Sequence, residues 1–127
     1  MHYRVLFFSS LLLFITACGD NESAPRPGNS ENTITVSDIG ATINISDVQA
    51  PDSVDINITG NNNTVSVINN TSVGKLSVTG TNNLINIETG VTINICVLDG
   101  SDNTLSKPSS LFVTCTIEGL GNSVMNF

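Results

Sequence analysis

Short runs in which apolar and polar residues alternate recur along the chain after residue 32, and no stretch carries a helical period. Val54–Ile58 and Thr64–Val67 form one pair of runs, and Leu76–Val78 and Leu84–Ile87 form the next. Alternation with a period of two, rich in Val, Ile and Thr, is typical of half-buried β-strands. Between the runs lie segments rich in Gly and Asn, such as Thr59–Asn63. Because both residue types tolerate positive φ angles, these segments predict tight turns.

The runs and turns repeat with a nearly constant period. Spacings of 20, 20, 20 and 19 residues separate Gly40, Gly60, Gly80, Gly100 and Gly119. Three places after each of the last four glycines stands an asparagine, in the order Asn63, Asn83, Asn103 and Asn122. The unit at Gly40 keeps the apolar positions only in part and has Ile43 in the asparagine place. We therefore expect a degenerate first unit, since terminal repeats are often atypical.

Two all-β architectures fit a strand–turn–strand–turn unit of fixed length. One is an antiparallel meander or sandwich, and the other is a parallel β-solenoid (β-helix), in which equivalent strands stack on successive coils. A sandwich needs only alternation, whereas a solenoid places equivalent residues about 4.8 Å apart. Stacked asparagines can then hydrogen-bond along the axis, as they do in cross-β ladders. We predict a small parallel β-solenoid over residues 32–127, with coils of about 20 residues, Gly/Asn corners and a structural ladder of Asn63, Asn83, Asn103 and Asn122.

The first seventeen residues predict export. Arg4 supplies a positive start, and Val5–Ile15 is an apolar stretch too short to span a bilayer, which needs about 20 residues. The sequence Ile15-Thr16-Ala17-Cys18 resembles the lipobox of bacterial lipoproteins. That resemblance implies cleavage before Cys18 and attachment of lipid to this cysteine. The alternative is a plain secretory signal followed by a chance cysteine.

We accordingly expect a lipoprotein signal peptide at residues 1–17, and a lipidated Cys18 with a flexible, disordered tether at residues 18–31. Residues 19–31 contain two Pro, two Gly and no large apolar residue, which is the composition of a linker. Two or more acyl chains anchor a protein stably, so the membrane is the first expected partner. Gly19 follows the cysteine where an Asp would signal retention at the inner membrane in the sorting scheme of lipoproteins. Delivery to the outer membrane, on its periplasmic or surface face, is expected if the host has two membranes.

The repeat also resembles a known family. Residues 59–67 read TGNNNTVSV and residues 79–87 read TGTNNLINI, and both are similar to the Gly-x-x-Asn-x-Val-x-Val units of the bacterial domain-of-unknown-function family 3060. The likeness covers about residues 54–127. It implies an exported protein with a β-solenoid and brings no established activity, so it supplies no catalytic residues.

The composition argues against nucleic-acid binding and against catalysis. The 127 residues hold 4 Lys+Arg against 11 Asp+Glu, a net charge of −7, so no basic face for nucleic acid is expected. The single histidine, His2, lies in the predicted signal, and the chain has no Trp. Without His, and with one cysteine pair that lacks metal-ligand spacing, a zinc site is not expected. We predict a non-enzymatic protein with no metal and no cofactor.

Cys96 and Cys115 each stand four places before a glycine, so the solenoid would place them on adjacent coils, facing the same way. Disulfides persist in exported proteins. A Cα separation near 4.8 Å lies within the range of a disulfide, but in-register Cβ atoms lie farther apart than a relaxed bridge prefers. The sequence therefore fits both a disulfide and two reduced, buried cysteines.

The aromatic residues after the predicted signal are Phe112 and Phe127. Both lie in the last unit, where we expect them to plug the open end of the solenoid. The alternative is an exposed aromatic contact for a ligand.

Together these features favour a lipid-anchored cell-envelope protein of structural or adhesive type. Its solenoid would present a rigid polar face to an envelope protein or a glycan, and end-to-end self-association is part of this hypothesis. The alternative is a module that binds glycan or a small ligand along one face of the coils. Ser66, Asn86 and Ser106 form an outward column that is polar but not identical, which favours the structural role.

Overall fold

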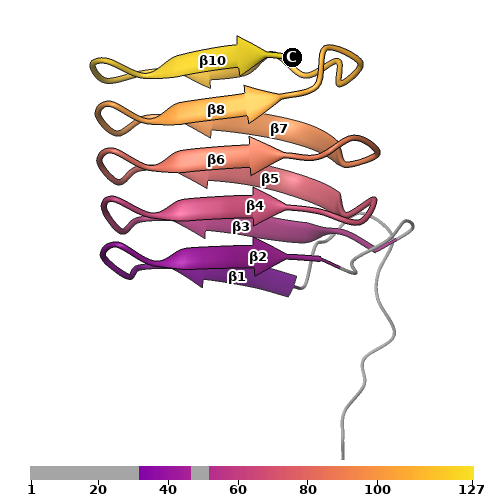
Figure 1. Cartoon of the computed structure of the whole chain (residues 1–127), viewed down its shortest axis with the longest axis horizontal. Coiled ribbons are helices and arrows are strands. Elements are labelled where there is room, and N and C mark those ends of the chain that lie inside the picture. The colour runs from indigo at the N-terminus through magenta and orange to yellow at the C-terminus, as the bar shows by residue number, and fades with distance from the viewer. Residues whose placement is uncertain (1–31, 47–51) are drawn as a thin grey trace, which may run out of the picture.

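The structure, a computed structural model, describes residues 32–46 and 52–127, which form ten β-strands and no helix. The first parallel sheet has the strand order β1-β3-β5-β7-β9, with bounds Asn32–Val36, Val54–Ile58, Ser72–Val78, Thr92–Leu98 and Cys115–Ile117. The second has the order β10-β8-β6-β4-β2, with bounds Ser123–Asn126, Thr104–Lys107, Leu84–Ile87, Thr64–Val67 and Thr42–Ile45. Consecutive strands alternate between the two sheets, so each coil adds one strand to each (Figure 1). The predicted all-β parallel solenoid is thus confirmed.

The predicted signal peptide at residues 1–17 and the predicted tether at residues 18–31, with Cys18, lie outside the described residues. Within the described ranges, the structure contains no helix of the length and apolar character needed to cross a membrane.

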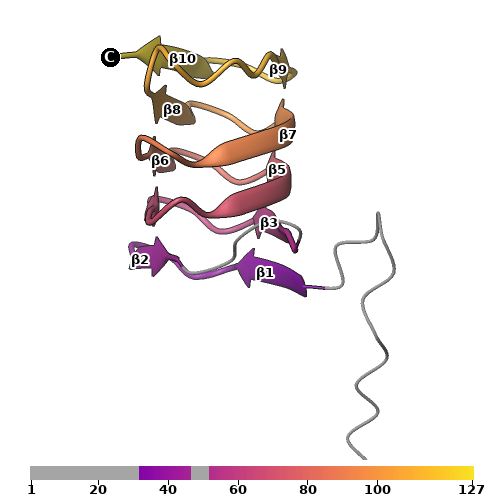
Figure 2. The ribbon, with the colours of Figure 1, turned by 90° about the vertical axis from the view of Figure 1, so that its right-hand side faces the viewer.

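The two sheets face each other, with the odd-numbered strands on one side and the even-numbered strands on the other (Figure 2). The hydrophobic core between them is a column of mainly aliphatic side chains. Alternate residues of each inner strand face inward: β3 buries Val54, Ile56 and Ile58, and β4 buries Val65 and Val67. Because the strands pair in register, each inward residue stacks on the inward residue of the next coil, as Val65 does on Ile85. Burial of this column supplies the main driving force for folding, at about 1.5–3 kcal/mol for each fully buried Val, Ile or Leu.

The first coil has a different length from the one that the glycine spacing predicts. The amide of Ala41 bonds to Asn63 across a separation of 22 residues, whereas the equivalent bond from Asn63 spans 20 residues and that from Asn103 spans 19. Both β1 and β2 carry this longer offset, so the additional residues fall in the connection between β2 and β3. That connection contains residues 47–51, which lie outside the described ranges.

The longer first coil corrects the predicted alignment of its residues. Ile43 stacks on Val65 in the core, and Ala41 takes the place of the ladder asparagine, so Ile43 does not replace that asparagine. The first coil therefore keeps its apolar positions, but it lacks the carboxamide and has Asp38 in the place of the repeat glycine. Gly40 is equivalent to Asn62 and not to Gly60, and both Gly40 and Asn62 have positive φ angles of 71° and 57°.

The repeated glycines Gly60, Gly80 and Gly100 have a different role, which is to let adjacent coils approach closely. A Cβ atom at Gly80 would lie 1.8 Å from the carbonyl oxygen of Gly60, and one at Gly100 would lie 1.8 Å from that of Gly80. The obstructing atoms belong to the backbone, so they cannot rotate away. The positive φ angles of these corners occur at Asn62, Asn82 and Asp102 instead.

We expect that Gly80→Ala will lower the free energy of unfolding by about 3 kcal/mol or more, because the added methyl group forces the two coils apart. Urea denaturation measures the loss. The exposed neighbour Thr79 provides the control, and Thr79→Ala should change stability by no more than about 0.5 kcal/mol. Equal effects of the two substitutions would contradict the close approach at Gly80.

Candidate functional site

The four repeat asparagines stack in one column at the corner that precedes β4, β6, β8 and β10. The backbone N–H of Asn63 donates to Oδ1 of Asn83 at 3.0 Å, and that of Asn83 donates to Oδ1 of Asn103 at 2.9 Å. The N–H of Asn103 donates in turn to Oδ1 of Asn122 at 2.9 Å. Each coil is therefore tied to the next through an asparagine side chain. Asn63, Asn83 and Asn103 are buried, so solvent does not compete for these bonds.

The amide nitrogens of the same side chains donate to backbone carbonyls of the preceding coil, the coil from whose N–H group the side-chain oxygen accepts. Nδ2 of Asn83 donates to the carbonyl of Gly60 at 2.9 Å, and Nδ2 of Asn103 donates to that of Gly80 at 2.8 Å. Both ends of each carboxamide are thus used inside the protein. In the part of the chain that the structure describes, no buried side-chain nitrogen or oxygen lacks a hydrogen-bond partner. The ladder is consequently a structural element and not a ligand site.

The ladder ends differently at the two ends of the solenoid. In the first coil the N–H of Ala41 donates to Oδ1 of Asn63 at 2.8 Å, but Ala41 has no carboxamide to offer. In the last coil Nδ2 of Asn122 donates to the carbonyl oxygens of Gly100 and Glu118, at 2.7 and 2.6 Å. The half-buried Asn122 is therefore held by its own coil as well as by the coil before it.

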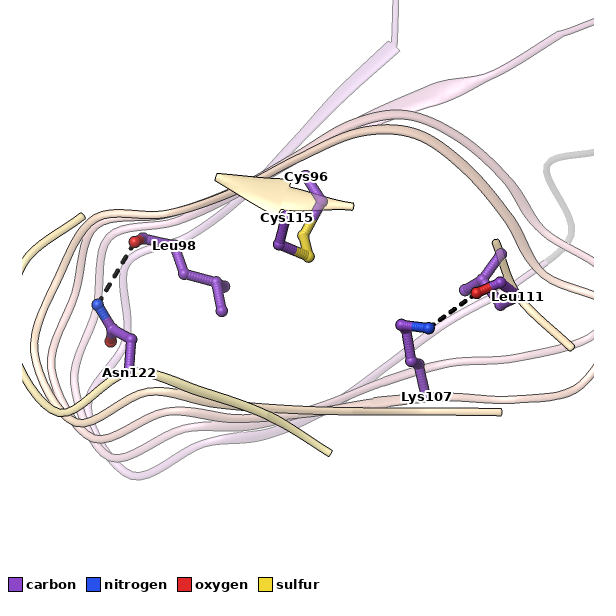
Figure 3. The surroundings of a disulfide bond; sticks show 6 residues. All are labelled: Cys96, Leu98, Lys107, Leu111, Cys115 and Asn122. Atoms are coloured by element: carbon purple, nitrogen blue, oxygen red, sulfur yellow. Dashed lines mark hydrogen bonds between the residues drawn. A yellow bond between two sulfur atoms is a disulfide. The ribbon is translucent and has the colours of Figure 1, made fainter. Parts of the chain in front are cut away.

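A disulfide lies within the last two coils. Cys96 on β7 pairs with Cys115 on β9, and the structure has the two residues bridged, with a Cα–Cα distance of 4.5 Å (Figure 3). The sequence fits either a disulfide or two reduced cysteines, and the structure has the disulfide. Cys96 is buried and Cys115 is half-buried. Because β9 has only three residues, the bridge supplements its few backbone hydrogen bonds to β7.

Sequence reasoning missed Lys107, which occupies an inward position at the end of β8. Its side chain is 8% exposed, and its Nζ donates to the carbonyl oxygen of Leu111 at 2.8 Å (Figure 3). The signal was present, since alternation from the buried Leu105 puts Lys107 on the inward side of the strand. Pro108 follows directly, and β10 pairs with β8 at this point through Asn126, so the stack continues past Lys107.

The prediction that Phe112 and Phe127 plug the end of the solenoid is wrong. Phe112 is 95% exposed and Phe127 is 67% exposed. Leu111 and Val113, on either side of Phe112 in the sequence, pack against the core instead. Because the loop residues alternate in direction, Phe112 points outward, where it helps to line two open hollows of about 330 and 380 Å³.

Apolar side chains are uncovered at the last coil. Val36 of the first coil and Ile117 of the last occupy the same core column, yet Val36 is 2% exposed and Ile117 is 50% exposed. Other large apolar residues of this coil are exposed as well. We call the set the C-terminal apolar end, and it consists of Phe112, Ile117, Leu120, Met125 and Phe127.

The lateral faces of the solenoid carry mainly polar side chains, but Leu84 on β6 and Ile95 on β7 are also exposed there. Ser66, Asn86 and Ser106 lie in register in one outward column, and Met125 continues this column in the last coil. In residues 32–46 and 52–127, no three His, Cys, Asp or Glu side chains cluster in a way that could hold a metal ion. The aromatic residues of these ranges are Phe112 and Phe127, so neither lies on the lateral face of an inner coil.

We predict that Asn103→Ala lowers the free energy of unfolding by about 3 kcal/mol, because it leaves the N–H of Asn83 buried without an acceptor. The carbonyl of Gly80 loses the shorter of its two hydrogen bonds and keeps the one from the N–H of Ser101. The matched control is Asn86→Ala, since Asn86 lies on the outward side of β6, and its loss should cost at most about 0.5 kcal/mol. Chemical denaturation compares the two variants. If they lose equal stability, the ladder does not hold the coils together.

Removal of both cysteines, in Cys96→Ala/Cys115→Ala, is expected to destabilise the protein by about 3 kcal/mol, because the bridge closes a loop of 19 residues. Thermal and urea unfolding with and without reductant measure the effect. Reductant should destabilise the unaltered protein by a similar amount and leave the double variant unchanged. Thiol titration checks that the disulfide is completely reduced. If the reduced protein is then as stable as the oxidised one, the bridge does not contribute to stability.

The comparisons with known proteins return nothing: no protein-family model, no curated protein and no solved structure matches this chain. The likeness of residues 54–127 to the domain-of-unknown-function family 3060 therefore stays a prediction, as does the likeness of residues 15–18 to a lipobox. The geometry itself gives a scaffold with fully engaged ladder groups, polar lateral faces and one uncovered apolar end.

Proposed function

We propose that this protein is a lipid-anchored component of the cell envelope with a structural or adhesive role and no catalytic activity. The lipid is carried by Cys18, and the tether at residues 18–31 joins it to the solenoid. In a host with two membranes the anchor lies in the outer membrane. The partner is an envelope protein or a glycan, in addition to the membrane itself, and neither a cofactor nor a nucleic acid takes part.

The placement of the exposed apolar residues is the observation that carries this proposal. Five of the eight exposed large apolar residues in the described ranges belong to the C-terminal apolar end, and the chain enters the solenoid at β1, at the opposite end of the stack (Figure 1). A protein anchored through its N-terminal segment would therefore direct its apolar end away from the lipid. The stacked sheets act as a spacer, with about 4.8 Å added for each strand.

The internal use of the ladder groups supports a scaffold role. The carboxamide of each buried asparagine hydrogen-bonds to the neighbouring coils, so the polar groups of the repeat rigidify the stack. A tether of residues 18–31, fully extended, would reach at most about 50 Å. A rigid body on a linker of this kind suits the display of a contact surface more than the enclosure of a substrate.

A second candidate function, binding of a glycan or a small ligand, has one specific observation in its favour. The exposed ring of Phe112 borders an open hollow of about 330 Å³. An aromatic ring of this kind is a common platform for apolar ligand faces. The hollow lies at the last coil and not along a coil face, so a ligand would bind at the C-terminal apolar end and compete there with any protein partner.

Metabolic labelling with radioactive palmitate tests the anchor. The protein should take up label and fractionate with membranes, and Cys18→Ala should abolish both, because the thiol that accepts the lipid is gone. Cys96→Ala/Cys115→Ala serves as the control and should keep the label. Label that survives in Cys18→Ala, or an unlabelled parent protein, would overturn the lipoprotein assignment.

A further inference from the structure

We infer that the C-terminal apolar end is a docking surface for a second copy of this chain, so that two solenoids pair end to end about a two-fold axis. The inference deepens the proposed structural role. It rests on that role only for the expectation that the C-terminal apolar end points away from the membrane.

The C-terminal apolar end combines exposed apolar side chains with two unpaired strand edges. β9 and β10 are the outermost strands of their sheets, so each has one edge with no neighbouring strand in the described structure. Neither strand contains a charged residue or a proline, which are two of the means by which an edge is protected from pairing; their short length, three and four residues, is the protection that they have. Clustered apolar residues of this kind on a soluble domain mark interaction surfaces.

The hollows beside Phe112 make this surface complementary to itself. The ring of Phe112 projects from the loop between β8 and β9, and the two hollows that it borders are open. The smaller hollow lies at the last coil, where Thr114 and Asn126 line it together with Phe112, and the larger one extends to residues 90–93 of the coil before. In the pair that we infer, the Phe112 ring of each copy enters the smaller hollow of the other. An interface of two identical patches requires this kind of self-complementarity.

The opposite end of the solenoid does not fit the C-terminal apolar end. Its outer strands expose mainly polar side chains, namely Asn32, Thr33, Thr35, Thr42 and Asn44. Ala41 occupies the ladder position there, so head-to-tail stacking would not extend the asparagine ladder beyond Asn122. The chain also continues from this end into residues 1–31, which a stacked neighbour would have to accommodate. Pairing of two C-terminal ends avoids all three difficulties.

A lipid surface is a poorer partner for the same residues. Interfacial membrane-binding surfaces place Lys and Arg beside their apolar residues. The described ranges contain two basic residues, of which Lys107 donates to a backbone carbonyl and Lys75 lies on β5, away from the last coil. The charged residue between Ile117 and Leu120 is the acidic Glu118. Apolar side chains of a second copy match this surface better than anionic headgroups.

A two-fold axis perpendicular to the solenoid axis inverts the second copy. Its outer strands then run antiparallel to those of the first, so the free edge of β10 can hydrogen-bond to an outer strand of the other copy. Such an arrangement closes at two copies, whereas head-to-tail stacking would continue into a filament.

The chain offers a matched pair of substitutions for the test. Ile39 and Leu120 occupy the same corner position in the first and last coils. Ile39 forms a β-bridge with Asn61 of the next coil, and the carbonyl of Leu120 accepts from the N–H of Asp102 in the coil before. Their side chains are 75% and 80% exposed. Sedimentation velocity of the full lipidated protein, in excess nonionic detergent and into the high micromolar range, should show a monomer–dimer equilibrium. Leu120→Ser should raise the dimer dissociation constant at least about tenfold, and Ile39→Ser should leave it unchanged.

Raised salt should strengthen the dimer, because the chain carries a net charge of −7 and like charges repel. Circular dichroism and thermal unfolding must show that both serine variants are folded. A protein that remains monomeric, assemblies that grow beyond dimers, or a larger effect of Ile39→Ser would each overturn the inference. Palmitate labelling of Leu120→Ser separates the two proposals, since loss of the dimer should leave the anchor at Cys18 intact.

Discussion

The rest of the structure depends on the contact at one corner of each coil, where a glycine carbonyl meets an asparagine carboxamide of the next coil. The carboxamide of Asn83 holds two backbone groups of the preceding coil, because Oδ1 accepts from the N–H of Asn63 and Nδ2 donates to the carbonyl oxygen of Gly60. This geometry requires a backbone approach that a Cβ atom would prevent. The glycine and the asparagine are therefore both required for one contact between coils, and this contact fixes the three-residue interval between them.

This corner fixes what the remaining surfaces can do. Once the coils are in register, inward aliphatic residues stack into a core and outward residues form straight polar columns. The ladder lies at the corner that precedes the second-sheet strands, so at the last coil the short β9 on the opposite sheet is tied by the disulfide instead. The same last coil leaves its core partly uncovered. A rigid body with inert sides and one apolar end is the result.

The sequence allowed the fold to be predicted, because four asparagines at one offset have no reason to recur outside a stack. It did not reveal which glycines share a role. Gly40 adopts a positive φ angle, as Asn62 does in the next coil, whereas Gly80 permits the close approach of two coils. Because both positions hold glycine, the sequence alignment of the first coil is wrong by two residues. The position of Phe112 in the last unit predicts a plug for the open end, but the alternation of its loop turns Leu111 and Val113 inward instead. Lys107 points inward although charged side chains usually face solvent. In the sequence, only the alternation along its strand from Leu105 predicts this orientation.

Hydrogen exchange of individual backbone amides tests most directly whether the asparagine ladder holds the coils together. The N–H groups of Asn83 and Asn103 lie at turns, where amides normally exchange fast, but both residues are buried and donate to carboxamide oxygens, those of the buried Asn103 and the half-buried Asn122. They should exchange as slowly as the core strands, near the limit set by global unfolding. Exchange as fast as that of the exposed turn residues Asn69 and Asn70 would contradict the account.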